Sequence, residues 1–396
     1  MAILSDLDLL ARLVSFDTTS ATKRPTRPLG DFVCEYLDHP KIRVERFDCG
    51  GDQENLWFET GPPSNGDGAG LLLCGHVDVV PATEPEWTAD PFVLRVEDDR
   101  AIGRGACDMK GFDAIAINLL REAANAGSLE APLGLLLTCN EEIGTVGAGQ
   151  FATQWAGRPL PHRTVVGEPT SLQPVRGHKG HLGMAIVIGG RGGHTGFPSR
   201  GVNAIERAIP VLEGLRDLRQ SMVEERLEIS ALFPETPFPV LTVAGIDGGS
   251  AINVMPESCV IRVGVRLLPG QSAGEFLTRI QSAIERRGVG VTMMSGDLDR
   301  PLPIASEHDC LVIDLNNTPS YAIDANADFL AEVANLVDDH GSHGANFGTD
   351  AGRLAGLGCE SVVFGPGNIG VAHKPNEWMP LDELARTPEL LRRLIR

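Results

Sequence analysis

Short apolar runs alternate with amphipathic stretches along the chain, a pattern typical of an α/β protein. Apolar runs predict strands at residues 44–47, 55–59, 71–74, 133–138, 165–166 and 361–364. Apolar residues spaced three and four positions apart predict helices at residues 7–14, 29–37, 109–126 and 327–338, and from residue 381 onward. We therefore expect a central mixed sheet flanked by helices.

The order of the elements changes after the sequence GHKG at residues 177–180. From there the pattern predicts strand 182–188, helix 202–218, strands 240–246 and 260–268, helix 273–287 and strand 289–294. This βαββαβ order is that of a ferredoxin-like domain. A chain of 396 residues also exceeds what one core usually serves. We predict an inserted domain at 179–296 and a discontinuous domain made of 1–178 and 297–396. Residues 298–321 show no pattern that we can assign.

Composition and charge favour a globular protein that acts on a small molecule over a membrane protein or a nucleic-acid-binding protein. The hydrophobic fraction of 42% and the charged fraction of 22% are those of an ordinary globular protein. There is no run of 18 apolar residues, and acidic residues stand where a signal peptide is basic, so we expect a cytoplasmic protein. The net charge of −19 opposes binding to nucleic acid or to an anionic membrane, and it favours a small-molecule substrate. The eight cysteines lack paired spacing, which predicts free thiols.

Candidate metal ligands begin at the end of the strand predicted at 71–74. His76 and Asp78 stand two residues apart, so an extended backbone aims both to one side. A metal-bound imidazole usually needs its second ring nitrogen held by a carboxylate or carbonyl, so His76 and Asp78 could be a ligand and the residue that orients it. Asp108 lies between a glycine-rich turn and the helix predicted at 109–126. These three residues are the first part of a predicted metal site.

Further acidic and imidazole side chains also follow predicted strands, namely Glu141, Glu142, Glu168 and His373. Open α/β sheets place their sites at the carboxyl ends of their strands, so we expect one shared site. Histidine and carboxylate ligands without cysteine suit Zn²⁺ or Co²⁺. The set is too large for one tetrahedral ion and fits two ions that share a carboxylate, about 3.5–4 Å apart. Of the pair Glu141 and Glu142, one could bind metal while the other serves as general base.

Other catalytic motifs are weaker or missing. The sequence GPGNIG at residues 365–370 matches GxGxxG, but the following VAHKP cannot start the helix that a dinucleotide pyrophosphate needs. There is no GK[ST] sequence for a nucleotide-binding loop and no GxSxG elbow for a nucleophilic serine. A metal-dependent hydrolase is therefore favoured. A metal-binding or oligomerisation scaffold without catalytic activity is the alternative from another class.

Eight short segments, spread over nearly the whole chain, carry a resemblance to a known family. They read HVDVVP, WTADPF, GRGACDMKG, CNEEIGTVGAG, VVGEPTS, GHKG, GVNAI and AHKPNEWMPLDEL. In this order they are similar to the dinuclear zinc peptidases that include acetylornithine deacetylase, succinyl-diaminopimelate desuccinylase and the carboxypeptidase G type. The resemblance implies a zinc-peptidase-like catalytic domain with an inserted ferredoxin-like lid through which two copies dimerise.

Three of these segments, WTADPF, GHKG and AHKPNE, favour the acetylornithine deacetylase branch. That branch implies removal of the N-acetyl group from N2-acetyl-L-ornithine, which gives ornithine and acetate in arginine biosynthesis. Acetylcitrulline deacetylase, succinyl-diaminopimelate desuccinylase and dipeptidase activities are the alternatives. Two departures from the family pattern leave side-chain specificity open: GVRLLPG has Gly264 where an acidic residue is common, and HTGFPSRG stands at residues 194–201 where HSAYPPYG is common.

The resemblance also implies a role for each candidate residue. For two Zn²⁺ or Co²⁺ ions per subunit it implies His76, Asp108 and Glu168 at one ion and Asp108, Glu142 and His373 at the other. It makes Glu141 the general base, Asp78 the residue that orients His76, and His194 a group that reaches the partner's site to stabilise the oxyanion. For the substrate it implies contacts from Arg266 and Asn253 to the α-carboxylate, with Lys179, Gly348 and Thr349 nearby.

Overall fold

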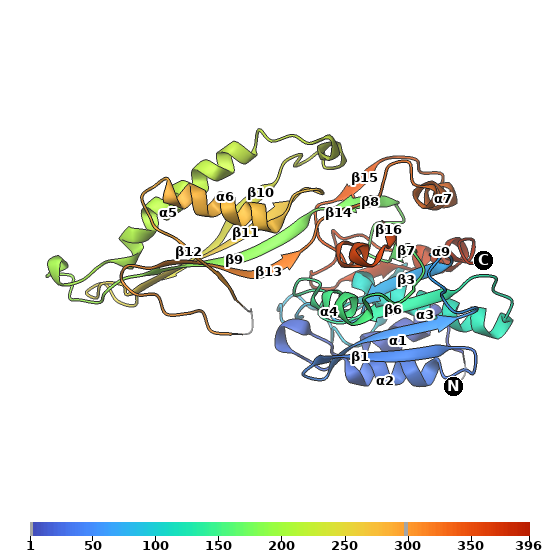
Figure 1. The fold of residues 1–396 in the computed structure, drawn as a ribbon. Helices are drawn as coiled ribbons and strands as arrows, with labels where there is room; N and C mark the ends of the chain where they lie inside the picture. Colours follow the sequence, from blue (N-terminus) through green and yellow to red (C-terminus); the bar gives the residue numbers. More distant parts are fainter. Residues whose placement is uncertain (1–2, 297–299) are drawn as a thin grey trace. The chain divides into compact units, whose positions relative to one another are not determined.

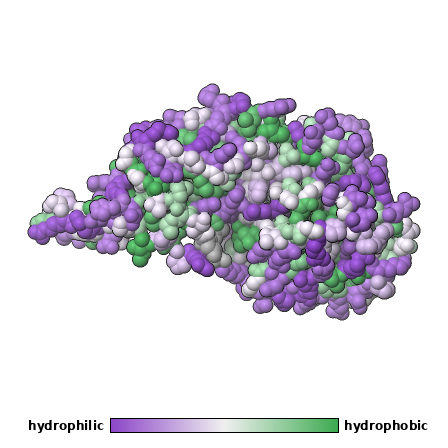
Figure 2. All heavy atoms as spheres, viewed as in Figure 1, coloured by the Kyte–Doolittle hydropathy of each residue, from purple (hydrophilic) through white to green (hydrophobic). Residues whose placement is uncertain are grey.

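The computed structural model describes residues 3–296 and 300–396 (Figure 1). The chain forms two compact units. The first contains the residues up to Gly177 together with Ala322–Gly344 and Thr349–Arg396, and the second contains His178–Tyr321 and Ala345–Gly348. In the view of Figure 2, hydrophilic residues cover much of the surface, in keeping with the net charge of −19.

A nine-stranded sheet runs through the first unit in the order β1-β2-β6-β3-β7-β16-β8-β14, with β15 paired to β8. Its strands are β1 (Arg43–Gly50), β2 (Gln53–Thr60), β3 (Leu71–His76), β6 (Leu133–Thr138), β7 (Arg163–Val166), β8 (Val175–His178), β14 (Tyr321–Ala322), β15 (His343–Ala345) and β16 (Glu360–Val363). The central strands β6, β3, β7 and β16 are parallel, so their carboxyl ends share one edge. Every residue of β3 and β6 is buried, as expected for strands covered on both faces.

Helices cover both faces of this sheet. Those of the first unit are α1 (Asp6–Val14), α2 (Arg27–Tyr36), α3 (Gly111–Ala126), α4 (Val146–Trp155), α7 (Asp328–Val337), α8 (Ala351–Leu354) and α9 (Leu381–Arg392). The α2 and α3 helices lie together, and Tyr36 donates a hydrogen bond to Asn118 across them. On the opposite face Trp57 of β2 packs against Phe151 and Trp155 of α4. The predicted central sheet with flanking helices is confirmed.

A small three-stranded sheet was not predicted. It consists of β4 (Arg95–Glu97), β5 (Arg100–Ile102) and β17 (Trp378–Pro380), in the order β17-β5-β4. Trp378 pairs with Ile102, which brings two segments that are far apart in the sequence side by side. These strands have only three residues each, too short to show a periodicity. The sheet matters because Asp108 follows β5 and His373 precedes β17.

The second unit is a five-stranded sheet with two helices packed on one face (Figure 1). Its elements are β9 (Gly180–Gly189), α5 (Ala204–Met222), β10 (Val240–Gly248), β11 (Ser258–Leu267), α6 (Ala273–Glu285), β12 (Thr292–Ser295) and β13 (Cys310–Thr318). The first six keep the predicted βαββαβ order. Buried and more exposed residues alternate along β11, because one face of the sheet carries the helices.

The strand β13 differs from the sequence expectation. Its residues belong to the stretch assigned to the discontinuous domain, yet β13 pairs along its length with β9 of the second unit. The sheet order is β10-β11-β9-β13-β12, so β13 stands beside β9 and β12 pairs with it in parallel. The second unit consequently runs to Tyr321 rather than ending at 296. Of the unassigned stretch, Leu298 and Asp299 lie outside the described residues.

Two general properties of the described residues bear on the sequence expectations. None of their helices combines the length and the apolar character that crossing a membrane requires. All eight cysteines are free thiols.

Candidate metal centre

His76 is the last residue of β3, and both of its ring nitrogens have partners. Its Nδ1 donates to the backbone carbonyl of Asp78 at 3.0 Å, and its Nε2 lies 3.0 Å from Asp108 Oδ1. The Asp78 carboxylate is farther from Nδ1, at 3.8 Å. It accepts instead from the backbone N–H groups of Glu141 and Glu142, at 3.0 and 3.2 Å. Asp78 thus orients His76 through its carbonyl and fixes the Glu141–Glu142 loop through its carboxylate.

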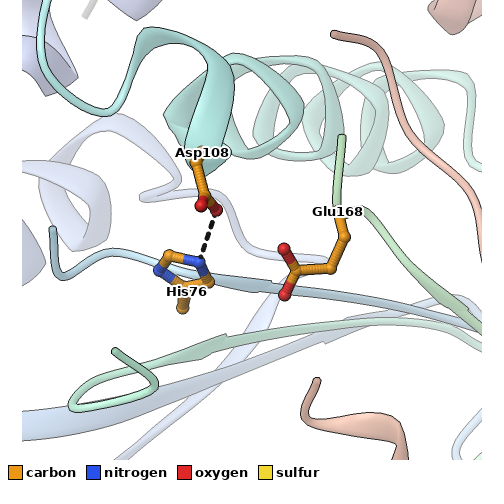
Figure 3. A group of neighbouring side chains, drawn as sticks. All are labelled: His76, Asp108 and Glu168. Atoms are coloured by element: carbon orange, nitrogen blue, oxygen red, sulfur yellow. Dashed lines mark hydrogen bonds and ion pairs between the residues drawn. The ribbon is translucent and has the colours of Figure 1, made fainter. Parts of the chain in front are cut away.

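Two clusters of candidate ligands meet at Asp108. One contains His76, Asp108 and Glu168, and the other contains Asp108, Glu142 and His373. In each cluster the three candidate ligand atoms lie within 4.8 Å of one another. Figure 3 shows the first cluster, with the carboxylate of Glu168 pointing toward the imidazole of His76. In the second, His373 Nε2 lies 3.0 Å from Asp108 and 3.1 Å from Glu142.

The sheet explains why these residues converge. His76 ends β3, Glu142 follows β6 by four residues and Glu168 follows β7 by two. These three strands are parallel neighbours, so their last residues lie at one edge. Asp108 enters from the turn before α3, and His373 from the loop between β16 and β17. All five predicted ligands therefore meet at the predicted edge of the sheet.

Several carboxylates are buried close together at this site, so keeping all of them ionised costs free energy unless a cation is bound. Burial and the charge of Asp108 raise the pKa of Glu142 to about 7 and also raise the pKa of Glu168. Burial would raise the pKa of Asp108 too, but hydrogen bonds with His373 and His76 hold it low. Hydrogen bonds to Asp108 and Glu142 raise the pKa of His373 to about 10. The carboxyl groups outnumber the imidazoles by six to two: Asp78, Asp108, Glu141, Glu142, Glu168 and Asp350 against His76 and His373.

That donor set fits divalent cations. Oxygen and imidazole nitrogen atoms are ligands that ions of the zinc type accept, and the excess of carboxylates supplies the negative charge. His76 has the tautomer that such a site needs, because Nδ1 carries the proton and Nε2 faces Asp108. Glu141 belongs to neither cluster of candidate ligands among the described residues. Burial and the nearby Glu168 raise the pKa of Glu141, as a general base requires.

Three buried residues at this site were missed by the sequence analysis. Asp350 is 2% exposed and accepts a hydrogen bond from Thr138, the last residue of β6, at 2.6 Å. Burial raises the pKa of Asp350 to about 6. Arg104 and Glu377 form an ion pair of 2.7 Å with both side chains 1% exposed. Arg104 lies within the GRGACDMKG segment and Glu377 is the last residue of AHKPNE, and this membership is their only sequence signal.

The remaining predicted site residues lie in or next to the second unit, in two groups. His194 and Asn253 are exposed neighbours: His194 pairs with Val254, and the Asn253 carbonyl accepts from the Thr195 backbone at 3.2 Å. His194 Nδ1 accepts from the Gly196 N–H at 3.0 Å, which leaves the proton on Nε2. The ring therefore presents an N–H donor.

The other group lies at the far end of the same sheet. Arg266 of β11 pairs with His181 of β9, and the charge of Arg266 adds to burial in lowering the pKa of Lys179 to about 8. Lys179 donates to the carbonyls of Thr236 and Phe238 at 2.6 and 3.2 Å.

Asn253 lies beyond the opposite end of the ten-residue strand β11. At about 3.3 Å per residue, the strand separates Asn253 from Arg266 by about 30 Å. One chain therefore does not bring both residues to one carboxylate, and their contact with the substrate stays a prediction. The last two predicted substrate contacts are Gly348 and Thr349. Gly348 lies against Thr318. Thr349 belongs to the first unit, and its hydroxyl accepts a hydrogen bond from the Ala351 N–H.

Comparisons with known proteins agree with this geometry. The profile of peptidase family M20/M25/M40 matches residues 72–396. The chain belongs to this family. A relative described as acetylornithine deacetylase from Myxococcus xanthus is 36% identical over 391 residues, covering 98% of this chain and 95% of that protein. One of the same description from Edwardsiella ictaluri is 35% identical over 331 residues, covering 83% and 81%.

Solved structures of the M20 family share the fold. A metallo-carboxypeptidase from Sulfolobus solfataricus superimposes with a TM-score of 0.78 at 16% identity, over 99% of this chain and 98% of that one. A dinuclear metal-binding peptidase from Bacillus subtilis gives a TM-score of 0.64 at 14% identity, over 98% and 97%. The predicted fold class and family are confirmed, and this M20 member is a metal-dependent hydrolase of amide bonds.

Proposed function

We propose that this chain removes the N-acetyl group from N2-acetyl-L-ornithine, giving ornithine and acetate. The observation that carries the proposal is the pair of ligand clusters joined at Asp108, with Glu141 beside them. Two relatives that share more than a third of their residues with most of the chain are described as acetylornithine deacetylases, which supports this substrate. The −19 charge is consistent with a small substrate whose side chain is cationic.

In the proposed centre, His76, Asp108 and Glu168 hold one Zn²⁺ or Co²⁺ ion, and Asp108, Glu142 and His373 hold a second. Such ions polarise an amide carbonyl and lower the pKa of water. Glu141 takes the proton from the attacking water and passes it to the leaving nitrogen, so that the amine departs neutral. The Asp78 carboxylate holds both N–H groups of the Glu141–Glu142 dipeptide, which keeps base and ligand in register.

The second unit supplies the remaining proposed groups. His194 presents an Nε2–H donor, which can stabilise the oxyanion that forms on the substrate carbonyl. Because His194 and Asn253 are adjacent, we propose that both enter the site of a partner copy. Arg266 and Lys179 then serve the site of their own chain, where a guanidinium binds the substrate's α-carboxylate through two hydrogen bonds. Gly348 and Thr349 are further proposed substrate contacts, as the family resemblance implies.

The proposed partner is a second copy of this chain, bound through the lid. The strand β10 is at the edge of the five-stranded sheet and exposes most of its residues. Ile246 on this edge is 51% exposed, and Ile205 and Ile209 of the adjoining α5 are 41% and 53% exposed. An edge strand with exposed apolar side chains can pair with another strand and bury that surface.

A substrate panel tests the proposed reaction. The values of kcat/KM would be compared for N2-acetyl-L-ornithine, N-acetylcitrulline, succinyl-diaminopimelate and a dipeptide, with the zinc-loaded and cobalt-loaded protein. We expect acetylornithine to give the highest value, at least tenfold above the others. A preference for another compound would reassign the substrate within the family. Two bound ions without turnover of any acyl compound would favour the scaffold alternative.

A further inference from the structure

A buried ion pair next to the metal centre has no role in the proposed reaction. Arg104 Nη1 donates to Glu377 Oε2 at 2.7 Å, and each side chain is only 1% exposed. Removing two charges from water carries a large desolvation cost, so such a pair adds little net stability by itself. What distinguishes this pair is the set of backbone groups that it also binds.

The second oxygen of Glu377 holds the segment that carries Asp108. Its Oε1 accepts from the backbone N–H groups of Cys107 at 2.9 Å and of Asp108 at 3.0 Å. Hydrogen bonds from backbone N–H groups to an ionised carboxylate are shorter and stronger than neutral ones. Asp108 is the residue that both ligand clusters share, so Glu377 fixes the backbone at their junction.

Arg104 binds two further segments of the same site. Its Nη2 donates to the carbonyl of Pro81 at 2.9 Å, in the loop that follows Asp78. Its Nη1 also approaches the carbonyl of Lys374 at 3.4 Å, one residue after His373. The Gly103 N–H donates to the Glu377 carbonyl at 2.9 Å, which continues the pairing of β5 with β17.

We propose that Arg104 and Glu377 are positioning residues that set the distance between Asp108 and His373. The inference rests on the proposed metal centre and concerns mainly the ion held by Asp108, Glu142 and His373. Two of those three ligands lie in segments that the ion pair joins. The ion held by His76, Asp108 and Glu168 has only Asp108 in such a segment, so it depends less on the pair.

The test is metal binding by Glu377→Gln. Glutamine keeps the shape, but its NH₂ group must face either the two backbone N–H donors or the guanidinium, so one set of hydrogen bonds is lost. Zinc binding would be measured by titration calorimetry and by elemental analysis per folded chain. We expect two ions in the unsubstituted protein and a loss of affinity at one site of about 10- to 100-fold, the range typical of residues that support ligands. At limiting zinc the variant should hold close to one ion.

The site affected is identified by a second substitution. Adding His373→Ala to Glu377→Gln should leave the remaining ion bound, whereas adding His76→Ala should remove it. If Glu377→Gln does not fold, Arg104→Lys serves instead, because it keeps the charge and loses the bonds to Pro81 and Lys374. Arg104→Lys should weaken the same site by a smaller factor.

Glu59 offers a matched control. It also accepts from a guanidinium, that of Arg43 at 2.9 Å, and from a backbone N–H, that of Ser64 at 3.1 Å. It pairs with Gly134 near the amino end of β6, away from the ligand edge. Glu59→Gln should bind two ions with unchanged affinity.

Unchanged binding in Glu377→Gln, or equal weakening in both glutamine variants, would overturn the positioning role. Fewer than two ions in the unsubstituted protein would overturn the metal centre and, with it, this inference.

Discussion

At the scale of single residues, the adjacent Glu141 and Glu142 have different proposed roles, and Asp78 holds the backbone of both. Its carboxylate binds the N–H groups of Glu141 and Glu142, and their side chains then diverge. Glu142 reaches His373 at 3.1 Å, while Glu141 stays outside both ligand clusters. The account therefore separates base from ligand in this dipeptide.

Replacing each glutamate in turn tests that separation. Glu141→Gln should lower kcat by about 10²- to 10⁴-fold, the usual contribution of a general base, and leave two ions bound. Glu142→Gln should lower the metal content toward one ion per chain. Both variants would be measured by steady-state kinetics and elemental analysis. Metal loss in Glu141→Gln with retention in Glu142→Gln would mean that the two roles are exchanged.

The sequence predicted the ligands because each follows a strand or a glycine-rich turn, and the strand order brings those positions together. It did not predict Arg104 with Glu377, which are 273 positions apart in the chain. Nor did it predict Asp350, whose hydrogen bond to Thr138 depends on the packing of α8 against the sheet. Contacts between residues so far apart in the chain leave no periodic pattern and no fixed spacing in the sequence from which they could be predicted.

At the scale of elements, the loop after β6 is held against the start of α4. The Asn55 side chain accepts from the Cys139 N–H at 3.0 Å and donates to the Gly147 carbonyl at 2.8 Å. A Cβ at Gly147 would lie 2.0 Å from the Cys139 carbonyl oxygen. Close packing here fixes the loop that carries Glu141 and Glu142.

Two glycines of α4 give a matched pair of substitutions. Gly147→Ala should destabilise the protein by about 1–3 kcal/mol, the usual effect of overpacking, and should lower kcat because the loop shifts. Gly149→Ala has no neighbour closer than 3.4 Å and should stabilise the helix by about 0.5–1 kcal/mol. Chemical denaturation and kinetics of both variants would check this. Similar effects of the two substitutions would contradict a specific contact at Gly147.

A buried histidine at the end of β8, His178, should make the stability of the protein depend on pH. His178 is fully buried, and burial lowers its pKa to about 4. Between pH 6.5 and 4 the unfolded chain takes up a proton that the folded chain does not, so the free energy of unfolding falls as the pH falls, by about 1.4 kcal/mol per unit. His178→Phe should reduce this slope, as measured by denaturation at pH 8, 6 and 5. Parallel pH profiles for the two proteins would contradict the assignment.

Element order was easier to predict than strand pairing. The βαββαβ order in the lid follows from periodicity, but the place of β13 between β9 and β12 does not. Residues 310–313 form an apolar run that could have indicated a strand. Nothing in that run shows which of two sheets it joins, because the pairing partner lies more than 120 residues earlier in the sequence.

At the scale of the whole molecule, the proposed site needs two copies. Asn253 lies before the first residue of β11 and Arg266 lies next to its last residue, so one chain cannot bring both to one substrate. The family resemblance predicted a dimer, and the exposed edge strand β10 offers a surface for it.

A charged substitution on that edge tests the dimer. Ile246→Asp should convert the dimer to a monomer in analytical ultracentrifugation, because a carboxylate at the pairing edge opposes burial. Its kcat should fall at least tenfold, since His194 would no longer reach the partner's site, while two ions stay bound. Val96→Asp, at a 50% exposed position on β4, is the control and should remain dimeric and active. Full activity of a monomeric Ile246→Asp would contradict the shared site.

The most direct test of the account is anomalous X-ray diffraction at the zinc absorption edge from crystals of the zinc-loaded protein. The account predicts two anomalous peaks about 3.5–4 Å apart, both beside Asp108. One should lie next to His76 and Glu168, and the other next to His373 and Glu142. A single peak, or peaks away from Asp108, would contradict the dinuclear centre on which the proposed hydrolysis depends.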